Sequence, residues 1–403
     1  MRQLSNTEAA LIEGIDQDAM LTRTMDWARI NSGTSNIEGL AKVAGELASA
    51  FSTLPGEVTL RDPSPVTVVD PEGREVEKPH GRHLVCSVRP EAKRRFLLTG
   101  HMDTVFPADH PFQSLTWLDD ETLNGPGTAD MKAGLSIILE ALKAFETSNA
   151  AANVGYDVMI NADEETGSLS SAALIDELAR GKHAALTYEP TALPDGTLAH
   201  ARSGSGNYSV VFTGRSAHAG RNPEDGRNAV VAAADCAIRL KKMQHADLPI
   251  NPAKIEGGAA NNVVPDHAVL RFNIRPKSIA AGKDFAHDLE AMLAELETAH
   301  DVAVHCHGGI SRPPKPVDEK AQKLFDLVRD TGAALGQTIG WKSTGGVCDG
   351  NNIAANHVPV VDTMGVRGGS IHSPDEFMIV PSLTERAQLS AVVLHRLATG
   401  DAL

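Results

Sequence analysis

Three short apolar segments most strongly constrain how this chain folds, because each runs directly into a loop that carries charged residues. They are Phe96–Thr99, Tyr156–Ala162 and Ala184–Thr187. Short runs of this kind are typical of parallel strands that are buried on both faces of a sheet. Helical patterns follow at residues 132–145 and 168–180, and two further helices are predicted in residues 5–53, separated at residues 31–35. The alternation of strand, loop and helix predicts an α/β fold with a doubly wound, mostly parallel sheet, in which ligands gather at the carboxyl ends of the strands.

The length of 403 residues exceeds that of one ordinary core, so two domains are expected. The alternation changes character near residue 200. From there, strand patterns at 207–213, 268–275 and 302–307 are interleaved with helical patterns at 225–243 and 283–298. This order predicts a small α+β domain with an antiparallel sheet. We expect it to be inserted at residues 202–312, between the two parts of a main domain, residues 1–201 and 313–403.

Composition limits the partners and the compartment. The 37 basic and 52 acidic residues give a formal net charge of −15, so we expect no binding to nucleic acid or to an anionic membrane surface. No segment approaches the roughly 20 apolar residues that span a bilayer, and the N-terminus lacks the apolar run of a secretory signal. The cysteines, Cys86, Cys236, Cys306 and Cys348, form no CxxC pair. They are interpreted as reduced thiols of a cytoplasmic protein.

Acidic and histidine residues lie where the predicted strands end. His101 and Asp103 follow the first strand, and the adjacent Glu164 and Glu165 follow the second. The remaining positions are Asp130 after a glycine-rich loop, Glu189 after the third strand and His372 in a loop near the C-terminus. Two imidazoles and three carboxylates are enough to ligate two divalent ions when one carboxylate serves both. Nitrogen and oxygen donors without cysteine suit Zn²⁺, with Co²⁺ and Mn²⁺ as alternatives.

Each of these residues also has an ordinary structural explanation when it is taken alone. Asp130 precedes a helix and can cap it, and His372 can be a solvated loop histidine. Adjacent acids at a buried strand end are harder to explain, because they repel one another unless cations compensate. Glu164 and Glu165 suggest a division of labour in which one ligates a metal and the other accepts a proton. The joint pattern predicts a metal-assisted hydrolase.

These residues resemble the motifs of the di-zinc metallopeptidase family that includes glutamate carboxypeptidase, aminoacylase, acetylornithine deacetylase and succinyl-diaminopimelate desuccinylase. The segment Tyr188–Thr191 is most similar to the glutamate carboxypeptidase branch. The resemblance implies that Asp130 bridges two zinc ions and is followed by a cis peptide bond. It also implies that His101 and Glu189 complete one ion's ligands, Glu165 and His372 complete the other's, Asp103 supports His101, and Glu164 is the general base and later the proton donor.

The resemblance also implies roles for the inserted domain, which corresponds to the family's lid and dimerisation domain. His218 is implied to reach the partner subunit's active site and to stabilise the oxyanion. Asn262 is implied to contact the oxyanion or the substrate amide, and Arg275 to clamp a substrate carboxylate bidentately. Further candidates for substrate binding are Arg312, for the carboxylate, and the glycine-rich loop at Gly345 and Gly346. We therefore expect a homodimer formed through the lid.

The expected activity is cleavage of an amide bond next to a C-terminal amino acid. The substrate is expected to be an N-acyl amino acid or a short peptide with a free carboxylate, as for glutamate carboxypeptidases. Aminoacylase, deacetylase or dipeptidase activity is the alternative within the family. An inactive homologue that binds a metabolite is the alternative outside enzymes, although the presence of Glu164 argues against it. A nucleophilic Cys348 is the weakest alternative, because no paired base is evident.

Overall fold

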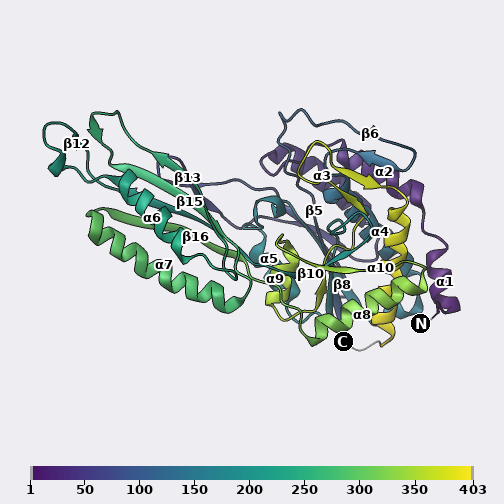
Figure 1. Cartoon of the computed structure of the whole chain (residues 1–403). Helices are drawn as coiled ribbons and strands as arrows, with labels where there is room; N and C mark the ends of the chain where they lie inside the picture. The colour runs from purple at the N-terminus through teal and green to yellow at the C-terminus, as the bar shows by residue number, and fades with distance from the viewer. Residues whose placement is uncertain (1–2, 401–403) are drawn as a thin grey trace.

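The computed structural model describes residues 3–400. It consists of an α/β body and an elongated extension, which points to the left in Figure 1. The body is built on a six-stranded sheet in the order β1-β4-β8-β5-β9-β18. The strands are β1 (Glu57–Arg61), β4 (His83–Val88), β5 (Arg95–His101), β8 (Gly155–Asn161), β9 (Ala184–Thr187) and β18 (Val360–Val361). Strands β8, β5, β9 and β18 run parallel, whereas β4 and β1 form an antiparallel edge. The predicted α/β class with a mostly parallel sheet is confirmed.

Helices cover both faces of this sheet, because successive side chains of a strand point to opposite faces. Along β5, Phe96 and Leu98 join the larger core and Leu97 joins the core on the other face. The larger core is covered by α2 (Gln17–Ala28), α3 (Ile37–Phe51), α4 (Ala133–Glu146), α8 (Glu319–Ala334) and α10 (Ser382–Thr399), with α1 (Asn6–Ile12) packed on α10. The opposite face is covered by α5 (Ala172–Ala179) and α9 (Asp349–Ala355). The carboxyl ends of β5, β8 and β9 consequently share one edge of the body.

The extension, which we call the lid, contains a four-stranded sheet in the order β13-β15-β11-β16, with every neighbouring pair antiparallel. Its elements are β11 (Ser205–Thr213), α6 (Ala229–Met243), β13 (Ile250–Gly257), β15 (His267–Ile274), α7 (Ile279–His300) and β16 (Ala303–Arg312). Both helices pack on one face of the sheet and enclose a separate hydrophobic core around Phe212, Phe272 and Phe285. The domain boundaries at residues 202 and 312 stay a prediction.

Short strands complete the molecule. They are β2 (Thr67–Val69) with β3 (Glu75–Glu77), β10 (Leu198–Arg202) with β17 (Trp341–Thr344), β12 (Ala217–His218) with β14 (Val263–Val264), and the group β6 (Thr116–Trp117), β7 (Thr122–Asn124), β20 (Phe377–Ile379) and β19 (Gly368–Gly369). Single helical turns cover Thr128–Lys132, Asn149–Asn153, Glu164–Thr166 and Pro223–Asp225. Within residues 3–400, every helix is too short or too polar to cross a bilayer.

The N-terminal region differs from its prediction. Residues 5–53 form α1, α2 and α3 rather than two helices. The first break comes at Asp16, whose side chain accepts a hydrogen bond of 3.0 Å from the Ala19 N–H and caps α2. The helical spacing of apolar residues continues across this break, so the sequence pattern did not separate α1 from α2.

Candidate metal centre

The carboxyl ends of three neighbouring strands and two further loops bring the five predicted metal ligands together. His101 is the last residue of β5, Glu165 lies in the turn after β8, and Glu189 follows β9. Asp130 lies in the turn that leads into α4, and His372 lies in the loop between β19 and β20. The side chain of His101 is buried, whereas that of His372 is half exposed. Segments that are far apart in the sequence therefore supply one cluster.

Asp130 lies between the two imidazoles. Its Oδ1 is 3.0 Å from His101 Nε2, and its Oδ2 is 3.3 Å from His372 Nε2. Glu189 Oε2 lies 3.5 Å from the same nitrogen of His101, and Glu165 Oε2 lies 3.1 Å from that of His372. Each imidazole nitrogen thus faces Asp130 and one further carboxylate. The arrangement is that of two adjacent ligand sets that share Asp130.

The donor atoms are close enough for metal ions. His101, Asp130 and Glu165 offer ligand atoms that all lie within 4.8 Å of one another, and so do His101, Glu164 and Glu189. Imidazole nitrogen and carboxylate oxygen are ordinary zinc ligands. Glu164 reaches the same space as the ligands, as a base beside the metals would.

Electrostatics also favour cations in this cluster. Burial raises the pKa of Glu165 to about 7, and the charge of Asp130 adds to the shift. Burial likewise raises the pKa of Glu164 and of Glu189. Hydrogen bonds to Asp130 and Glu165 raise the pKa of His372 to about 11. Burial therefore disfavours the ionised form of these carboxylates. Divalent cations would stabilise the ionised form, so the residues fit a metal centre.

Asp103 is fully buried beneath the cluster and orients two of its parts. His101 Nδ1 lies 3.0 Å from the backbone carbonyl oxygen of Asp103 and 3.4 Å from its Oδ1. The same carboxylate accepts hydrogen bonds of 3.2 Å each from the N–H groups of Glu164 and Glu165, and one of 2.7 Å from Thr34 Oγ1. A ligating histidine commonly donates its second N–H in this way, which fixes its tautomer.

Two buried charges that no sequence motif indicated shape the Asp130 turn. The Glu376 carboxylate accepts hydrogen bonds from the N–H groups of Asp130, Ala129 and Gly127 at 3.0, 3.0 and 3.2 Å. Lys132 Nζ is buried and donates to Ser32 Oγ at 2.6 Å. The peptide bond between Asp130 and Met131 is cis, as the resemblance implied. Neither Glu376 nor Lys132 follows a strand end, so the pattern that revealed the other acids did not mark them.

A cavity of about 730 Å³ opens over the cluster and is also lined by Arg202, Arg275 and Arg312. Arg202, which no sequence motif indicated, donates to Asp362 at 2.8 and 3.2 Å and to the Gly346 carbonyl oxygen at 3.1 Å. Arg275 donates to the neutral Asn273 side chain at 2.9 Å and has no acidic partner among residues 3–400. Among the three arginines of the cavity, Arg275 is therefore the one whose positive charge is not paired with a carboxylate of the described residues.

Arg312 was a candidate for the substrate carboxylate, but its position in this structure suggests another function. It is buried and forms ion pairs with Glu164 at 2.8 Å and with Asp349 at 3.1 Å, and it donates to Ser168 Oγ at 2.9 Å. These contacts hold the guanidinium against the general-base candidate. Binding of the substrate carboxylate by Arg312 stays a prediction. It would require Arg312 to give up its contacts with Glu164 or Asp349.

Three residues predicted to bind the substrate or the oxyanion do not line the cavity. His218 and Asn262 are exposed near β12 and β14, at the far end of the lid in Figure 1. Gly345 lies beside the cavity residue Gly346 but is not part of the lining. A single chain therefore does not bring His218 to its own cluster, and the predicted roles of His218 and Asn262 would require a partner subunit.

Cys348 does line the cavity, but its environment does not suit a nucleophile. Its thiol is buried and points at Asp362 Oδ2 at 3.6 Å. Burial raises the pKa of Cys348 well above its ordinary value, and the thiol rather than the reactive thiolate is then present at neutral pH.

Comparisons with known proteins agree with this geometry. The model of peptidase family M20/M25/M40 matches residues 97–396. The chain is 29% identical to carboxypeptidase G2 of Pseudomonas sp. (strain RS-16) over 96% of this chain and 91% of that protein. It shares its fold with aminopeptidase PepT of Bacillus cereus, at a TM-score of 0.71 and 22% identity over 95% and 99% of the two chains. It shares it also with the Bacillus subtilis YXEP protein, a dinuclear metal binding peptidase, at a TM-score of 0.66 and 13% identity over 95% and 98%. Because the family match spans most of the sequence, including every predicted metal ligand, the chain belongs to peptidase family M20/M25/M40.

Proposed function

We propose that this chain is a di-zinc hydrolase that cleaves the amide bond next to a C-terminal amino acid in N-acyl amino acids or short peptides. The observation that carries the proposal is the position of Asp130 between His101 and His372, with a second carboxylate beside each imidazole. Asp130 would bridge the ions, with Co²⁺ or Mn²⁺ as alternatives to Zn²⁺. The similarity to carboxypeptidase G2 supports a substrate with a C-terminal residue, glutamate among the candidates.

Bound zinc would supply Lewis-acid activation of both the attacking water and the amide carbonyl. Glu164 accepts a proton from the attacking water and delivers it to the leaving amine nitrogen. Its buried position and raised pKa suit an acid that must both take and return a proton. Arg312, 2.8 Å away, holds the carboxylate in place before substrate arrives.

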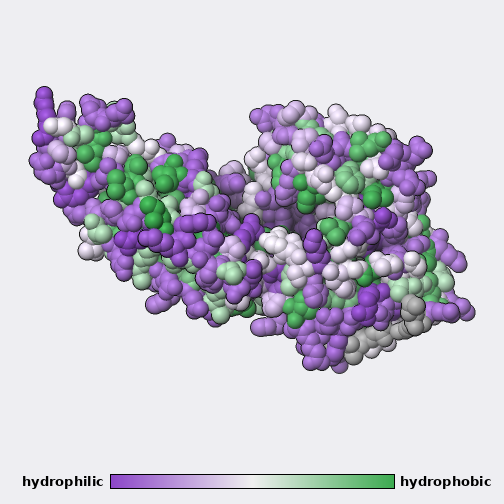
Figure 2. Space-filling model, viewed as in Figure 1, coloured by the Kyte–Doolittle hydropathy of each residue, from purple (hydrophilic) through white to green (hydrophobic). Residues whose placement is uncertain are grey.

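Substrate orientation is proposed to rest on the lid. Arg275 has free guanidinium donors at the cavity and would bind the substrate carboxylate bidentately. Gly346 lines the same cavity. His218 and Asn262 would come from the lid of a second subunit and stabilise the oxyanion. Apolar side chains gather on the lid surface over α6 in Figure 2, and such a patch suits a dimer interface. Val231 and Ile238 of α6 are exposed apolar side chains.

A panel of substrates tests this proposal. The purified protein, loaded separately with zinc, cobalt or manganese, is assayed on N-acyl amino acids, on dipeptides with a free amine, and on the same compounds with an amidated C-terminus. We expect hydrolysis of N-acyl amino acids that carry a free carboxylate and little hydrolysis of the amidated forms. Preference for dipeptides with a free amine would instead support the dipeptidase alternative. Absence of hydrolysis throughout, with metal bound, would support the inactive homologue.

A further inference from the structure

A second cluster of potential metal ligands lies outside the cavity, where the hairpin β2–β3 crosses the lid sheet. The hairpin lies on the sheet face opposite α6 and α7, with Val69 packed against Val211 and Val269. Arg271 Nη2 also donates to the Val69 carbonyl oxygen at 2.9 Å. Because side chains alternate along β16, His305 and His307 point to this face while Cys306 between them packs towards the helices. The two histidines consequently face the hairpin.

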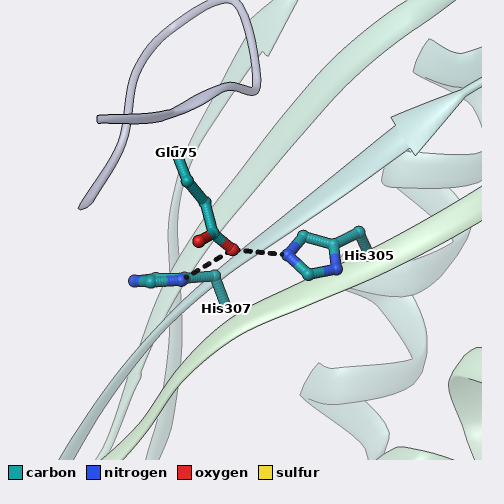
Figure 3. Close-up of side chains that lie close together, drawn as sticks. All are labelled: Glu75, His305 and His307. Atoms are coloured by element: carbon teal, nitrogen blue, oxygen red, sulfur yellow. Dashed lines mark hydrogen bonds and ion pairs between the residues drawn. The ribbon is translucent and has the colours of Figure 1, made fainter. Parts of the chain in front are cut away.

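Glu75 of β3 reaches both histidines, as Figure 3 shows. Its Oε1 lies 2.9 Å from His305 Nε2 and 3.3 Å from His307 Nδ1. One donor atom from each of the three residues lies within 4.8 Å of the others. All three side chains are at least partly accessible to solvent, with exposed fractions of 44% for Glu75, 61% for His305 and 25% for His307. An ion can therefore reach the cluster directly.

The hydrogen bonds of His307 indicate that a positive species belongs between it and Glu75. Its Nε2 lies 3.0 Å from the backbone carbonyl oxygen of Thr67. A carbonyl oxygen only accepts, so Nε2 must carry the hydrogen. In the neutral ring, Nδ1 then presents a lone pair to the Glu75 carboxylate, and two acceptors face each other. Either a second proton or a metal ion resolves this conflict.

We propose that Glu75, His305 and His307 form a site for one divalent, zinc-like ion that links the hairpin to the lid sheet. Zinc bonds to nitrogen and oxygen measure about 2.0–2.2 Å, so neighbouring ligand atoms of a tetrahedral site lie about 3.3–3.5 Å apart. The distances from Glu75 Oε1 to the two imidazole nitrogens differ from this by a few tenths of an ångström. The N–H of His307 on the Thr67 carbonyl supplies the outer hydrogen bond that ligating histidines commonly make. Water would occupy the fourth position.

This site would restrain the lid independently of the cavity metals. The hairpin joins the chain to the body sheet through β4, whereas β16 belongs to the lid and ends at the cavity residue Arg312. An ion held by both segments would therefore slow the local opening of the hairpin. The consequence is measurable at residues 67–77 whether or not the chain hydrolyses an amide.

The test compares the full-length wild type with the double variant His305→Gln/His307→Gln. Glutamine keeps a hydrogen-bond donor for Glu75 but is a poor zinc ligand. Zinc bound at saturation is measured by equilibrium dialysis, and amide hydrogen exchange of residues 67–77 is followed with and without zinc. We expect the double variant to bind one fewer ion per chain and to lose the zinc-dependent protection of the hairpin.

His267→Gln is the matched control, because His267 lies on the same sheet and contacts the same hairpin, 3.1 Å from the Pro71 carbonyl oxygen, without joining the cluster. It should keep the wild-type ion count and the zinc-dependent protection. Equal zinc binding and equal protection in the wild type and the double variant would overturn the proposal. In that case an imidazolium of His307 paired with Glu75 accounts for the geometry.

Discussion

At the scale of single residues, the site combines side chains that are unremarkable alone. From the sequence, Asp130 could be a helix cap and His372 an ordinary loop histidine. In the structure, Asp130 Oδ2 lies 3.3 Å from His372 Nε2. Their convergence at one edge of the sheet distinguishes them from ordinary structural residues. Glu164 and Arg275 have the most specific proposed roles among these side chains.

Glu164→Gln tests the proton-transfer role. The amide keeps the size of the side chain but cannot accept the proton, so kcat is expected to fall by about 10²- to 10⁴-fold while the metal content is unchanged. Steady-state kinetics and metal analysis on the same sample provide the readout. Glu177→Gln, at an exposed acid paired with Arg61, is the control and should leave kcat unchanged. Near-wild-type kcat in metal-replete Glu164→Gln would show that another group moves the proton.

Arg275→Ala tests the carboxylate clamp. Hydrogen bonds to charged groups contribute about 1.5–3 kcal/mol, so KM for substrates with a free carboxylate is expected to rise about 10- to 100-fold. The slowly hydrolysed amidated substrates serve as an internal control, because they cannot use the clamp and their kcat/KM should not change. An equal change for both substrate classes would assign Arg275 a structural rather than a recognition role.

At the scale of elements, the helices and strands with strong hydrophobic periodicity were predicted from the sequence. The apolar runs of β5, β8 and β9 and the helices α4 and α7 were found near their observed limits, because burial on both faces or along one face leaves a clear pattern. The lid strand β13 was missed because it is a largely exposed edge strand that contains Pro252. Short hairpins such as β2–β3 have too few residues for periodicity to show.

The candidate site residues differ in the same way. The acids at strand ends could be selected from the sequence because strand ends converge in an α/β fold. Glu376 and Arg202 were missed because each acts through a contact distant in sequence, with the Asp130 turn and with Asp362. The residues next to Glu376 and Arg202 in the sequence give no indication of these tertiary contacts. The position of Arg312 against Glu164 likewise emerged only from the fold.

A buried ion pair joins the terminal helices. Glu8 of α1 and Arg396 of α10 lie 2.6 Å apart, and both side chains are almost fully buried. Glu8→Gln leaves Arg396 without its counter-charge, so the free energy of unfolding is expected to fall by about 3–5 kcal/mol. Urea denaturation at pH 7 measures the change. Glu38→Gln, in an exposed pair with Lys42, should change it by less than about 0.5 kcal/mol. An equally small effect of Glu8→Gln would contradict the assigned role of the buried pair.

The pair also predicts a pH dependence. Although burial opposes ionisation, the hydrogen bond and charge of Arg396 lower the pKa of Glu8 from 4.5 to about 2. The folded-state pKa lies below the unfolded value, so the stabilisation is complete above pH 4.5 and is lost as the pH falls towards 2. The stability difference between wild type and Glu8→Gln should therefore be smaller at pH 3.5 than at pH 7. A difference independent of pH would contradict this titration.

At the scale of the whole molecule, the lid extends far from the body and the surface is hollowed between them in Figure 2. His218 lies at the far end of the lid, so the proposed catalytic role requires a second copy of the chain. Under this proposal, the expected homodimer is required for activity. An arrangement that is complete within one chain would not use His218.

Mixing two inactive variants tests the shared site. Each of Glu164→Ala and His218→Ala should be nearly inactive alone. In a mixed dimer, the His218→Ala chain keeps Glu164 and receives an intact His218 from its Glu164→Ala partner. Subunit exchange between the folded dimers should therefore restore a substantial part of the activity. Light scattering establishes the dimer in each sample. Activity of the mixture no higher than the sum of its components would place His218 outside the active site.

The most direct measurement of the central claim is anomalous X-ray scattering from crystals of the zinc-loaded protein. The account predicts two strong zinc peaks about 3.5–4 Å apart, one on each side of the Asp130 carboxylate, with His101 and Glu189 on one ion and His372 and Glu165 on the other. A single zinc peak beside Asp130, or no zinc there, would contradict it, whereas an additional peak at Glu75, His305 and His307 would not.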